Sequence, residues 1–560
     1  MNEKELYTEL IDALKQKKLS KDEFSKLKNK LCKKHNVVQP PTDIQILLHA
    51  TPEDAQKMKL VTKPIRTISG VAVIAIMSYP FACKHGKCMY CPGGPGSPFG
   101  DIPQSYTGRE PATMRAIRNK YDPYLQVFNR LEQYIALGHF PDKIELIIMG
   151  GTFPSFDLQY QKEFITYALK AMNDFGKEFF PKGKFDFKKY KEFFEMPGEM
   201  KDEARVKRIQ ERVFALKGKS ELEKEQKRNE KAKIRCVAMC LETRPDYCFE
   251  KEINTMLELG TTRVELGAQT VYEEILKKIK RGHTVKDTIK ATQLMKDSFL
   301  KVGYHMMPGL PGSDYERDLD MFKELFTNPD FQPDALKIYP CMVIEGTELF
   351  DLWKQRKYSP LTTEKAAQML VEAKKFIPEY CRIMRVQRDI PTTMIAAGVD
   401  RTNLRQYISK ILKEKKIKCR CIRCREPKRR EIDFKAVQIK RIDYEASNGK
   451  EIFLSAVDET NDILLGFCRL RIPYQPFRPE ITKNSAGIRE LHVYGTAVPI
   501  GEKGEIQHKG LGKKLLLEAE RIAKEEFKCK KMLVISGIGV REYYKKFGYK
   551  KDGIYVSKKL

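Results

Sequence analysis

The segment from Val71 to Cys91 reads VAVIAIMSYPFACKHGKCMYC and joins two different features. Its first seven residues form an apolar run rich in β-branched side chains, which is typical of a strand buried on both faces. Three cysteines, Cys83, Cys88 and Cys91, follow within one loop. Because parallel sheets carry reactive groups on the loops at the carboxyl ends of their strands, the segment predicts a strand that leads into a metal-binding loop.

Apolar runs of the same kind recur along the chain, with helical periodicity between them. They span Ile144–Met149, Ile234–Leu241, Arg263–Gly267, Val302–Met307 and Ala335–Tyr339. Six strands that alternate with helices predict an α/β fold, in which a parallel sheet curves into a partial (β/α)6 barrel. An insertion rich in Lys, Glu and Phe, over residues 182–233, is expected to form solvated helices.

The chemistry of the first triplet favours an iron–sulfur cluster. Three closely spaced thiolates can hold three irons of a cubane and leave the fourth iron open to a ligand. The alternatives are free cysteines or a structural zinc ion, and zinc would require a fourth ligand such as His85, which lies inside the same loop.

The triplet resembles the cysteine motif of the radical S-adenosylmethionine superfamily, although its C-x4-C-x2-C spacing is longer than the commonest C-x3-C-x2-C. The longer form resembles the Elongator catalytic subunit family in its stand-alone archaeal or bacterial form. The resemblance covers nearly all of the chain beyond residue 40. It continues through Gln104–Gly108, Met149–Phe153, Glu242–Asp246, Arg281–Thr284, His305–Pro308 and Gln387–Pro391.

This resemblance implies a 4Fe–4S cluster on Cys83, Cys88 and Cys91 that binds and cleaves S-adenosylmethionine to a 5′-deoxyadenosyl radical. It also implies cofactor contacts at the later strand ends, from Gly150, Gly151, Thr152, Glu242 and Gln269. Glycines there would let the backbone approach a ligand closely. Ordinary turns and salt bridges within the barrel mouth would produce the same sequence pattern.

The C-terminal part changes to hairpin-like strands, followed by the segment Gln507-His508-Lys509-Gly510-Leu511-Gly512-Lys513 and a helix. This Q-x-x-G-x-G pattern resembles the coenzyme A motif of the GNAT acetyltransferases, so we expect an α+β acetyl-CoA-binding domain. A helix N-terminus with glycines suits a pyrophosphate. The resemblance implies acetyl-CoA contacts at Lys143, Glu490, Leu491, His492, Val493, Gly510, Leu511, Gly512, Lys513 and Tyr544. Tyr544 and Tyr543 are the candidate catalytic residues, and Tyr543 could equally be a core residue.

A second triplet, Cys419, Cys421 and Cys424, lies in a basic segment between the two halves. Three thiolates within six residues predict a structural zinc site whose fourth ligand the sequence does not identify. The alternative is three free cysteines.

The formal net charge of +29 favours a polyanionic partner, although solvated lysines that serve solubility are the simpler alternative. Neither a membrane span nor a signal peptide is apparent, so a cytoplasmic protein is expected.

We predict a basic helical N-terminal region at residues 1–65, a radical S-adenosylmethionine domain at 66–400, a cysteine-rich linker at 401–432 and a GNAT-type domain at 433–560.

The combined resemblance implies an enzyme that places a carboxymethyl group on C5 of the wobble uridine of tRNA. The methyl carbon of acetyl-CoA would attack C5 after hydrogen abstraction, and thioester hydrolysis would follow. The implied partners are the tRNA anticodon stem-loop and a reductant for the cluster, and homodimerisation is left open. Two other classes are considered: a protein lysine acetyltransferase with a structural cluster, and a nucleic-acid-binding scaffold with vestigial sites.

Overall fold

The computed structural model describes residues 2–16, 19–51, 53–54, 58, 70–198, 202–428, 430–494 and 510–560. Within these residues, no helix combines the length and the apolar character that crossing a bilayer requires. The expected segment Gln507 to Lys509 lies outside the described residues.

The central part of the chain forms a sheet of seven parallel strands in the order β1-β4-β5-β6-β7-β8-β9. Their bounds are Ala72–Met77, Lys143–Met149, Arg235–Thr243, Arg263–Gln269, Lys301–Met306, Ala335–Ile338 and Arg382–Arg385. The first six correspond to the predicted strands, and every residue of β6 is buried. The short strand β9 was not predicted, because its sequence RIMR contains no apolar run.

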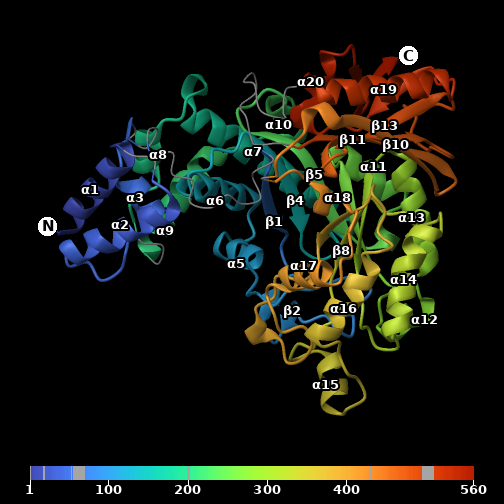
Figure 1. Cartoon of the computed structure of the whole chain (residues 1–560), viewed down its shortest axis with the longest axis horizontal. Helices are drawn as coiled ribbons and strands as arrows, with labels where there is room; N and C mark the ends of the chain where they lie inside the picture. Colours follow the sequence, from blue (N-terminus) through green and yellow to red (C-terminus); the bar gives the residue numbers. More distant parts are fainter. Residues whose placement is uncertain are drawn as a thin grey trace.

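Helices connect the strands and surround this curved sheet (Figure 1). They are α5 (Pro111–Arg118), α6 (Pro123–Ala136), α7 (Leu158–Phe179), α11 (Glu250–Leu259), α12 (Glu273–Lys278), α13 (Val285–Asp297), α14 (Tyr315–Thr327), α15 (Glu348–Lys354), α16 (Thr363–Ala373) and α17 (Leu404–Glu414). A short hairpin of β2 (Gly94–Ser97) and β3 (Gly100–Ile102) follows the cysteine loop.

The insertion between β4 and β5 forms α8 (Phe187–Phe193), α9 (Glu203–Lys217) and α10 (Leu222–Asn229). These helices are less solvated than the sequence predicts. Tyr190, Phe194 and Val213 are buried in the same core as the barrel helices, because the Phe-rich positions give the insertion an apolar face.

The C-terminal sheet has the order β10-β11-β12-β13-β14-β16-β15. Its strands are Val437–Ala446, Gly449–Asp458, Ile463–Ile472, Ser485–Val493, Lys531–Val534, Tyr555–Lys559 and Lys550–Asp552 in that spatial order. The helices α19 (Leu511–Glu525) and α20 (Arg541–Lys545) complete this unit, which lies against the barrel (Figure 1). The linker contributes α18 (Ile422–Arg425).

The two halves meet where the barrel strands begin. Lys301, at the start of β7, lies 2.7 Å from Glu490 on β13, and Asp334, just before β8, binds Arg489 on the same strand at 2.6 Å. Arg471 on β12 binds Asp297 at 2.6 Å, and both side chains are fully buried. The C-terminal sheet therefore covers the amino ends of the barrel strands, opposite the cysteine loop.

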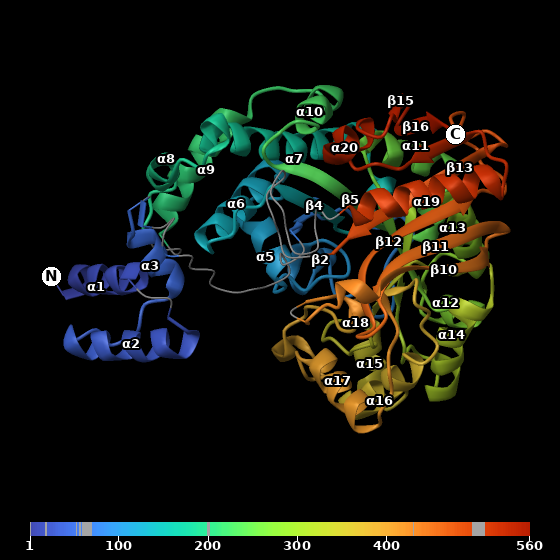
Figure 2. The ribbon, with the colours of Figure 1, turned by 45° about the horizontal axis from the view of Figure 1, so that its top comes forward.

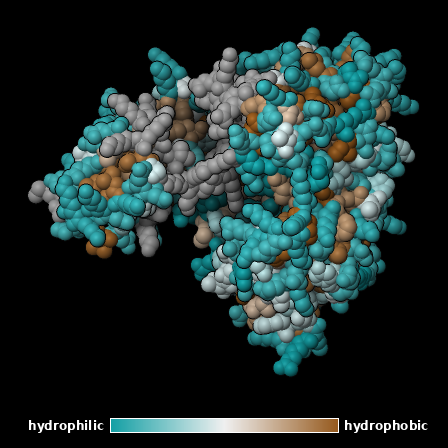
Figure 3. Space-filling model, in the orientation of Figure 1, coloured by the Kyte–Doolittle hydropathy of each residue, from teal (hydrophilic) through white to brown (hydrophobic). Residues whose placement is uncertain are grey.

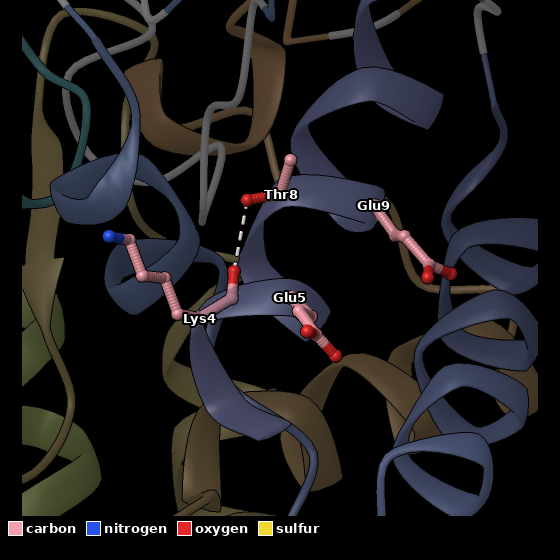
Figure 4. A pocket seen from close by; sticks show the side chains of 4 residues that line it. All are labelled: Lys4, Glu5, Thr8 and Glu9. Carbon is pink, nitrogen blue, oxygen red and sulfur yellow. Dashed lines mark hydrogen bonds between the residues drawn. The ribbon is translucent and has the colours of Figure 1, made fainter. Parts of the chain in front are cut away.

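At the N-terminus, α1 (Asn2–Gln16), α2 (Lys21–Lys34) and α3 (Asp43–His49) form a small unit with its own apolar core, at one end of the molecule (Figure 2). A shallow hollow on α1 is lined by Lys4, Glu5, Thr8 and Glu9 (Figure 4). The Thr8 hydroxyl donates to the Lys4 carbonyl at 3.0 Å, and Glu9 accepts from Lys34 of α2 at 2.7 Å. The hollow is thus part of the packing of α1 on α2. The visible surface is mostly hydrophilic (Figure 3).

Candidate functional site

The three cysteines of the first triplet lie in the loop beyond the carboxyl end of β1. Cys88 and Cys91 are buried and Cys83 is half-buried. Burial raises the pKa of the Cys83 thiol, and burial together with Cys88 raises that of Cys91 to about 11. A buried thiol with a raised pKa keeps its proton. It loses that proton and becomes a ligand when a metal supplies the positive charge that stabilises the thiolate.

Hydrogen-bond donors surround the sulfur atoms. The Ser105 N–H donates to the Cys91 sulfur at 3.2 Å, and the Arg281 guanidinium lies 3.6 Å from the Cys88 sulfur. The Thr152 hydroxyl lies 3.8 Å from the Cys83 sulfur. Donors of this kind stabilise thiolates and tune the potential of a cluster.

The spacing of the sulfur atoms distinguishes the two triplets. Among the described residues, Cys419, Cys421 and Cys424 form a group whose ligand atoms all lie within 4.8 Å of one another, as binding to one ion requires. The first triplet does not form such a group, even though His85 lies 3.2 Å from the Cys88 sulfur. A wider separation fits a cluster, because each thiolate then binds a different iron.

The loop after β4 lies beside the cysteine loop. Gly150 has φ +109°, and a Cβ there would lie 2.5 Å from the Ser78 hydroxyl, so packing within the protein already requires this glycine. Gly151 has φ +68° and more open surroundings. Thr152 is buried at the end of this turn. The structure therefore brings Gly150, Gly151 and Thr152 to the cysteine loop, and their contacts with a cofactor stay a prediction.

Gln269 ends β6 in a strained conformation. Its φ is +71°, a region that L side chains rarely adopt, and its buried Oε1 has no hydrogen-bond partner within the described chain. Arg244 Nη1 is also buried and also has no hydrogen-bond partner within the described chain. Strain and unpaired polar atoms at a barrel mouth are typical of a ligand site.

Charged residues fill the interior of the barrel below this mouth. Lys337 binds Glu242 at 2.6 Å and also contacts Glu265, and His305 lies 2.9 Å from Glu265. Burial alone would raise the pKa of Glu265, but Lys337 and Arg263 hold it well below its usual range. The predicted cofactor residue Glu242 is therefore held ionised within an ion-pair network, with its other oxygen 3.5 Å from the Tyr106 hydroxyl.

The second candidate site begins where β13 separates from β14. Within the described residues, β14 pairs with Ser485–Ile488 of β13 and no further, whereas β12 pairs with β13 as far as Val493. One backbone edge of the segment 490–493 consequently has no strand partner among the described residues. An extended ligand arm can add to such an edge through main-chain hydrogen bonds.

The start of α19 lies beside this edge. Gly510 caps the helix with φ +81°, and Lys514 makes the first helical hydrogen bond to its carbonyl. The N–H groups of Leu511, Gly512 and Lys513 therefore face the space before the helix, which is a favourable position for an anion. A Cβ on Gly512 would lie 3.5 Å from Val493, so the two predicted segments are adjacent.

The structure distinguishes the two tyrosines of α20. The Tyr543 hydroxyl would lie 3.0 Å from a Cβ on Gly512, at the start of α19. Tyr544 is 6% exposed and packs in the apolar core of this half. The Tyr543 hydroxyl therefore lies beside the predicted ligand-binding helix start, whereas Tyr544 packs in the core, and the catalytic roles of both tyrosines stay predictions.

Glu490 and His492 face the barrel. Burial alone would raise the pKa of Glu490, but Lys301 and Arg469 hold it well below its usual range, and burial lowers the pKa of His492 to about 4. Lys143 begins β4, where it pairs with Arg235 of β5, and Arg235 lies against Gly539 of the C-terminal half. Glu490 and His492 therefore lie at the contact between the halves, with Lys143 one strand position away from it, and a contact of Lys143 with acetyl-CoA stays a prediction.

Family models match successive parts of the chain. The ELP3 N-terminal domain matches residues 3–68, the Radical SAM superfamily 77–325, the Radical_SAM C-terminal domain 333–414 and the Acetyltransferase (GNAT) family 419–549. The chain is 41% identical to Elongator complex protein 3 of Schizosaccharomyces pombe, over 99% of this chain and 97% of that protein. It belongs to the Elongator complex protein 3 family.

Archaeal members of the Elongator complex protein 3 family are more similar still. A protein of Methanocaldococcus jannaschii named tRNA uridine(34) acetyltransferase is 52% identical, over 98% of this chain and 95% of that protein. The solved structure of archaeal Elp3 from Methanocaldococcus infernus, with an N-terminal deletion, has 47% identity and a TM-score of 0.72. The match covers 88% of this chain and 100% of the chain in that structure. The predicted fold, a curved parallel half-barrel with a GNAT domain and an N-terminal helical region, is confirmed.

Several residues of the site were not predicted individually. Arg281, His283 and Arg244 lie at the barrel mouth, where burial and the two arginines lower the pKa of His283 to about 2 and keep its ring neutral. The motif segments contain all three residues: Arg244 follows β5, whereas Arg281 and His283 lie between α12 and α13. Their spacing indicates a site, but it does not show which side chains point inward.

Proposed function

We propose that this member of the Elongator complex protein 3 family modifies the wobble uridine of tRNA, using S-adenosylmethionine and acetyl-CoA to add a carboxymethyl group at C5. The observation that carries the proposal is the presence, in one chain, of a three-cysteine loop at the barrel mouth and an open β13 edge beside a glycine-capped helix. The names of the archaeal relatives support the tRNA substrate. No similar support exists for a protein lysine acetyltransferase.

The residues present fit the groups that the two domains imply. Cys83, Cys88 and Cys91 would hold a 4Fe–4S cluster, which when bound would supply the electron for cleavage of S-adenosylmethionine. Arg281 and the Ser105 N–H would stabilise the cysteine sulfurs. Gln269, with its unpaired oxygen, would donate or accept at the polar end of the cofactor.

In the C-terminal half, the N–H groups of residues 511–513 would bind the pyrophosphate of acetyl-CoA, and the free edge of residues 490–493 would bind its pantetheine arm. Gly510 gives the helix start the turn that exposes those N–H groups. Tyr543 and Tyr544 would lie near the thioester, as the resemblance to the family implies. Their catalytic role, the domain boundaries, a cytoplasmic location and the need for a reductant of the cluster stay predictions.

The proposal is tested by the nucleosides of the substrate. Purified enzyme, reconstituted anaerobically and supplied with reductant, S-adenosylmethionine, acetyl-CoA and a tRNA transcript with a wobble uridine, should yield 5-carboxymethyluridine on digestion and mass spectrometry. Omission of either small molecule should abolish the product. Unmodified uridine together with acetyl-lysine on added protein would instead support the acetyltransferase alternative.

We further propose that Cys419, Cys421 and Cys424 bind one structural zinc ion. The Lys374 ammonium donates to the Cys419 sulfur at 3.4 Å and to the Cys424 sulfur at 3.9 Å. Burial alone would lower its pKa, but the three cysteines raise it. A positive charge at this distance favours the thiolate form that binds a metal ion. The Ile422 N–H donates to the Cys381 carbonyl at 3.0 Å, which ties this site to the strand β9. The ion would stiffen the junction between the two halves.

Elemental analysis tests the zinc site. The purified protein should contain about one zinc per chain, and C421S should lose most of it and unfold at a lower temperature, because folding is coupled to metal binding. The control C529S changes a buried cysteine of the C-terminal half and should retain the metal. Full zinc content in C421S would contradict the assignment.

A further inference from the structure

A group of aromatic rings lies at the rim of the barrel mouth and has no part in the sites above. Tyr79 and Phe81 occupy the short segment between β1 and Cys83, and they are 52% and 38% exposed. Phe156 and Tyr160, which follow β4, and Tyr121, which precedes α6, surround them. Large exposed aromatic side chains next to a reactive loop call for a functional explanation.

The rings are held in place by the protein. The Phe81 and Phe156 centroids are 4.7 Å apart, Phe81 meets Tyr160 edge-on at 5.2 Å, and Tyr79 meets Tyr121 edge-on at 5.8 Å. The Tyr79 N–H also donates to the Tyr160 hydroxyl at 2.9 Å. The exposed faces are therefore preorganised, which lowers the entropy cost of stacking a ligand on them.

The aromatic group adjoins the radical site. Ser78, next to Tyr79, donates to the Gly150 carbonyl at 2.9 Å, and a Cβ on Gly151 would lie 3.8 Å from the Phe156 ring. Cys83 follows Phe81 by two residues. A planar group stacked on Tyr79 or Phe81 would thus lie directly beside the position of the cluster.

The charge of this region favours a nucleic-acid ligand over an apolar protein partner. Lys84 and Lys87 are exposed between the cysteines of the same loop, and the chain carries a net charge of +29. Exposed aromatic faces combined with lysines are the usual surface for single-stranded RNA, because bases stack on the rings and phosphates pair with the cations.

We infer that Tyr79 and Phe81 form a stacking platform for an unpaired base of the anticodon loop, adjacent to the uridine that enters the active site. This inference rests on the proposed tRNA substrate and adds the surface that orients it. The rings stack on the π-face of a flanking base, and every base has such a face. The platform therefore positions the target uridine without recognising the RNA sequence. Lys84 and Lys87 bind the phosphates on either side of that nucleotide.

Binding measurements without cofactors test the platform separately from the reaction. The probes are a synthetic anticodon stem-loop with a wobble uridine and a blunt RNA duplex with the same stem. The double variant Y79L/F81L should bind the stem-loop about five- to a hundredfold more weakly, as expected for one lost stack, and should bind the duplex unchanged. Its affinity for the stem-loop should decrease with salt concentration as steeply as that of the unaltered protein, because no phosphate contact is removed.

Two variants serve as controls. Y79W/F81W keeps the π-faces and should retain stem-loop affinity, which excludes a folding defect of the segment. Y474L removes a 57% exposed tyrosine of the C-terminal half and should change nothing. Equal stem-loop affinity of Y79L/F81L and the unaltered protein, or an equal loss for the duplex, would overturn the platform. Stem-loop binding that depends on the platform, in an enzyme that forms no 5-carboxymethyluridine, would instead disprove the proposed function.

Discussion

C88A should reduce formation of 5′-deoxyadenosine from S-adenosylmethionine to background while leaving tRNA affinity within about twofold. Cys88 is buried at the centre of the cysteine loop, with Arg281 3.6 Å and His85 3.2 Å from its sulfur. With two cysteine ligands left, the loop cannot hold three irons of a cubane, so no open iron would be presented to the cofactor. The measurement is chromatography of the reaction after anaerobic reconstitution and reduction.

The matched control is C248A, which removes another fully buried thiol of the same half from a position outside both triplets. It should retain iron, sulfide and cofactor cleavage. Loss of tRNA binding in C88A, with normal cofactor cleavage, would mean that the triplet stabilises the fold and does not support chemistry.

D334A should lower the free energy of unfolding by about 3–5 kcal/mol, the usual cost of leaving buried charges without their partner. The Asp334 carboxylate binds Arg489 through two hydrogen bonds of 2.8 and 2.6 Å, and Arg469 lies 3.4 Å away. It also accepts from the Val302 N–H at 2.8 Å. One carboxylate therefore joins the barrel to two strands of the C-terminal sheet. Its removal takes one buried anion from both arginines, so that Arg489 keeps only Glu451 and Arg469 keeps only Glu490 as an acidic partner.

Chemical denaturation followed by circular dichroism provides the test. E316A removes an exposed acidic residue of the neighbouring helix α14 and should shift the transition by less than about 0.5 kcal/mol. An unchanged transition in D334A would show that the Asp334 ion pairs do not contribute to holding the two halves together. A separate early transition of the C-terminal half would show, in contrast, that the ion pairs maintain the interface.

The strands that position the radical site could be predicted because most of their residues are apolar or β-branched. The run from Val71 to Met77 corresponds closely to β1. The helix start was predicted from Gly510 and Gly512, and α19 begins there. Strand β9 was not visible, because Arg382 and Arg385 contact charged partners and leave only two apolar residues in the strand. Short strands at a sheet edge depend on tertiary contacts for their stability.

The charged barrel interior could not be predicted for a related reason. Arg263, Glu265 and Lys337 occupy buried strand positions where sequence patterns lead one to expect apolar residues. They are tolerated because each charge has an opposite charge within reach, and such pairs come from strands far apart in sequence. The contact between the halves depends on the same kind of long-range pairing, so no local pattern revealed it.

The most direct test of the account is the fate of the acetyl carbons. Reconstituted enzyme should be given acetyl-CoA labelled with carbon-13 at both acetyl positions, together with S-adenosylmethionine, reductant and a tRNA with a wobble uridine. We expect both labelled carbons in 5-carboxymethyluridine, because one chain combines the candidate radical site with the candidate acetyl-CoA site. Modified uridine without label, or labelled acetyl groups found on protein while the uridine stays unchanged, would contradict it.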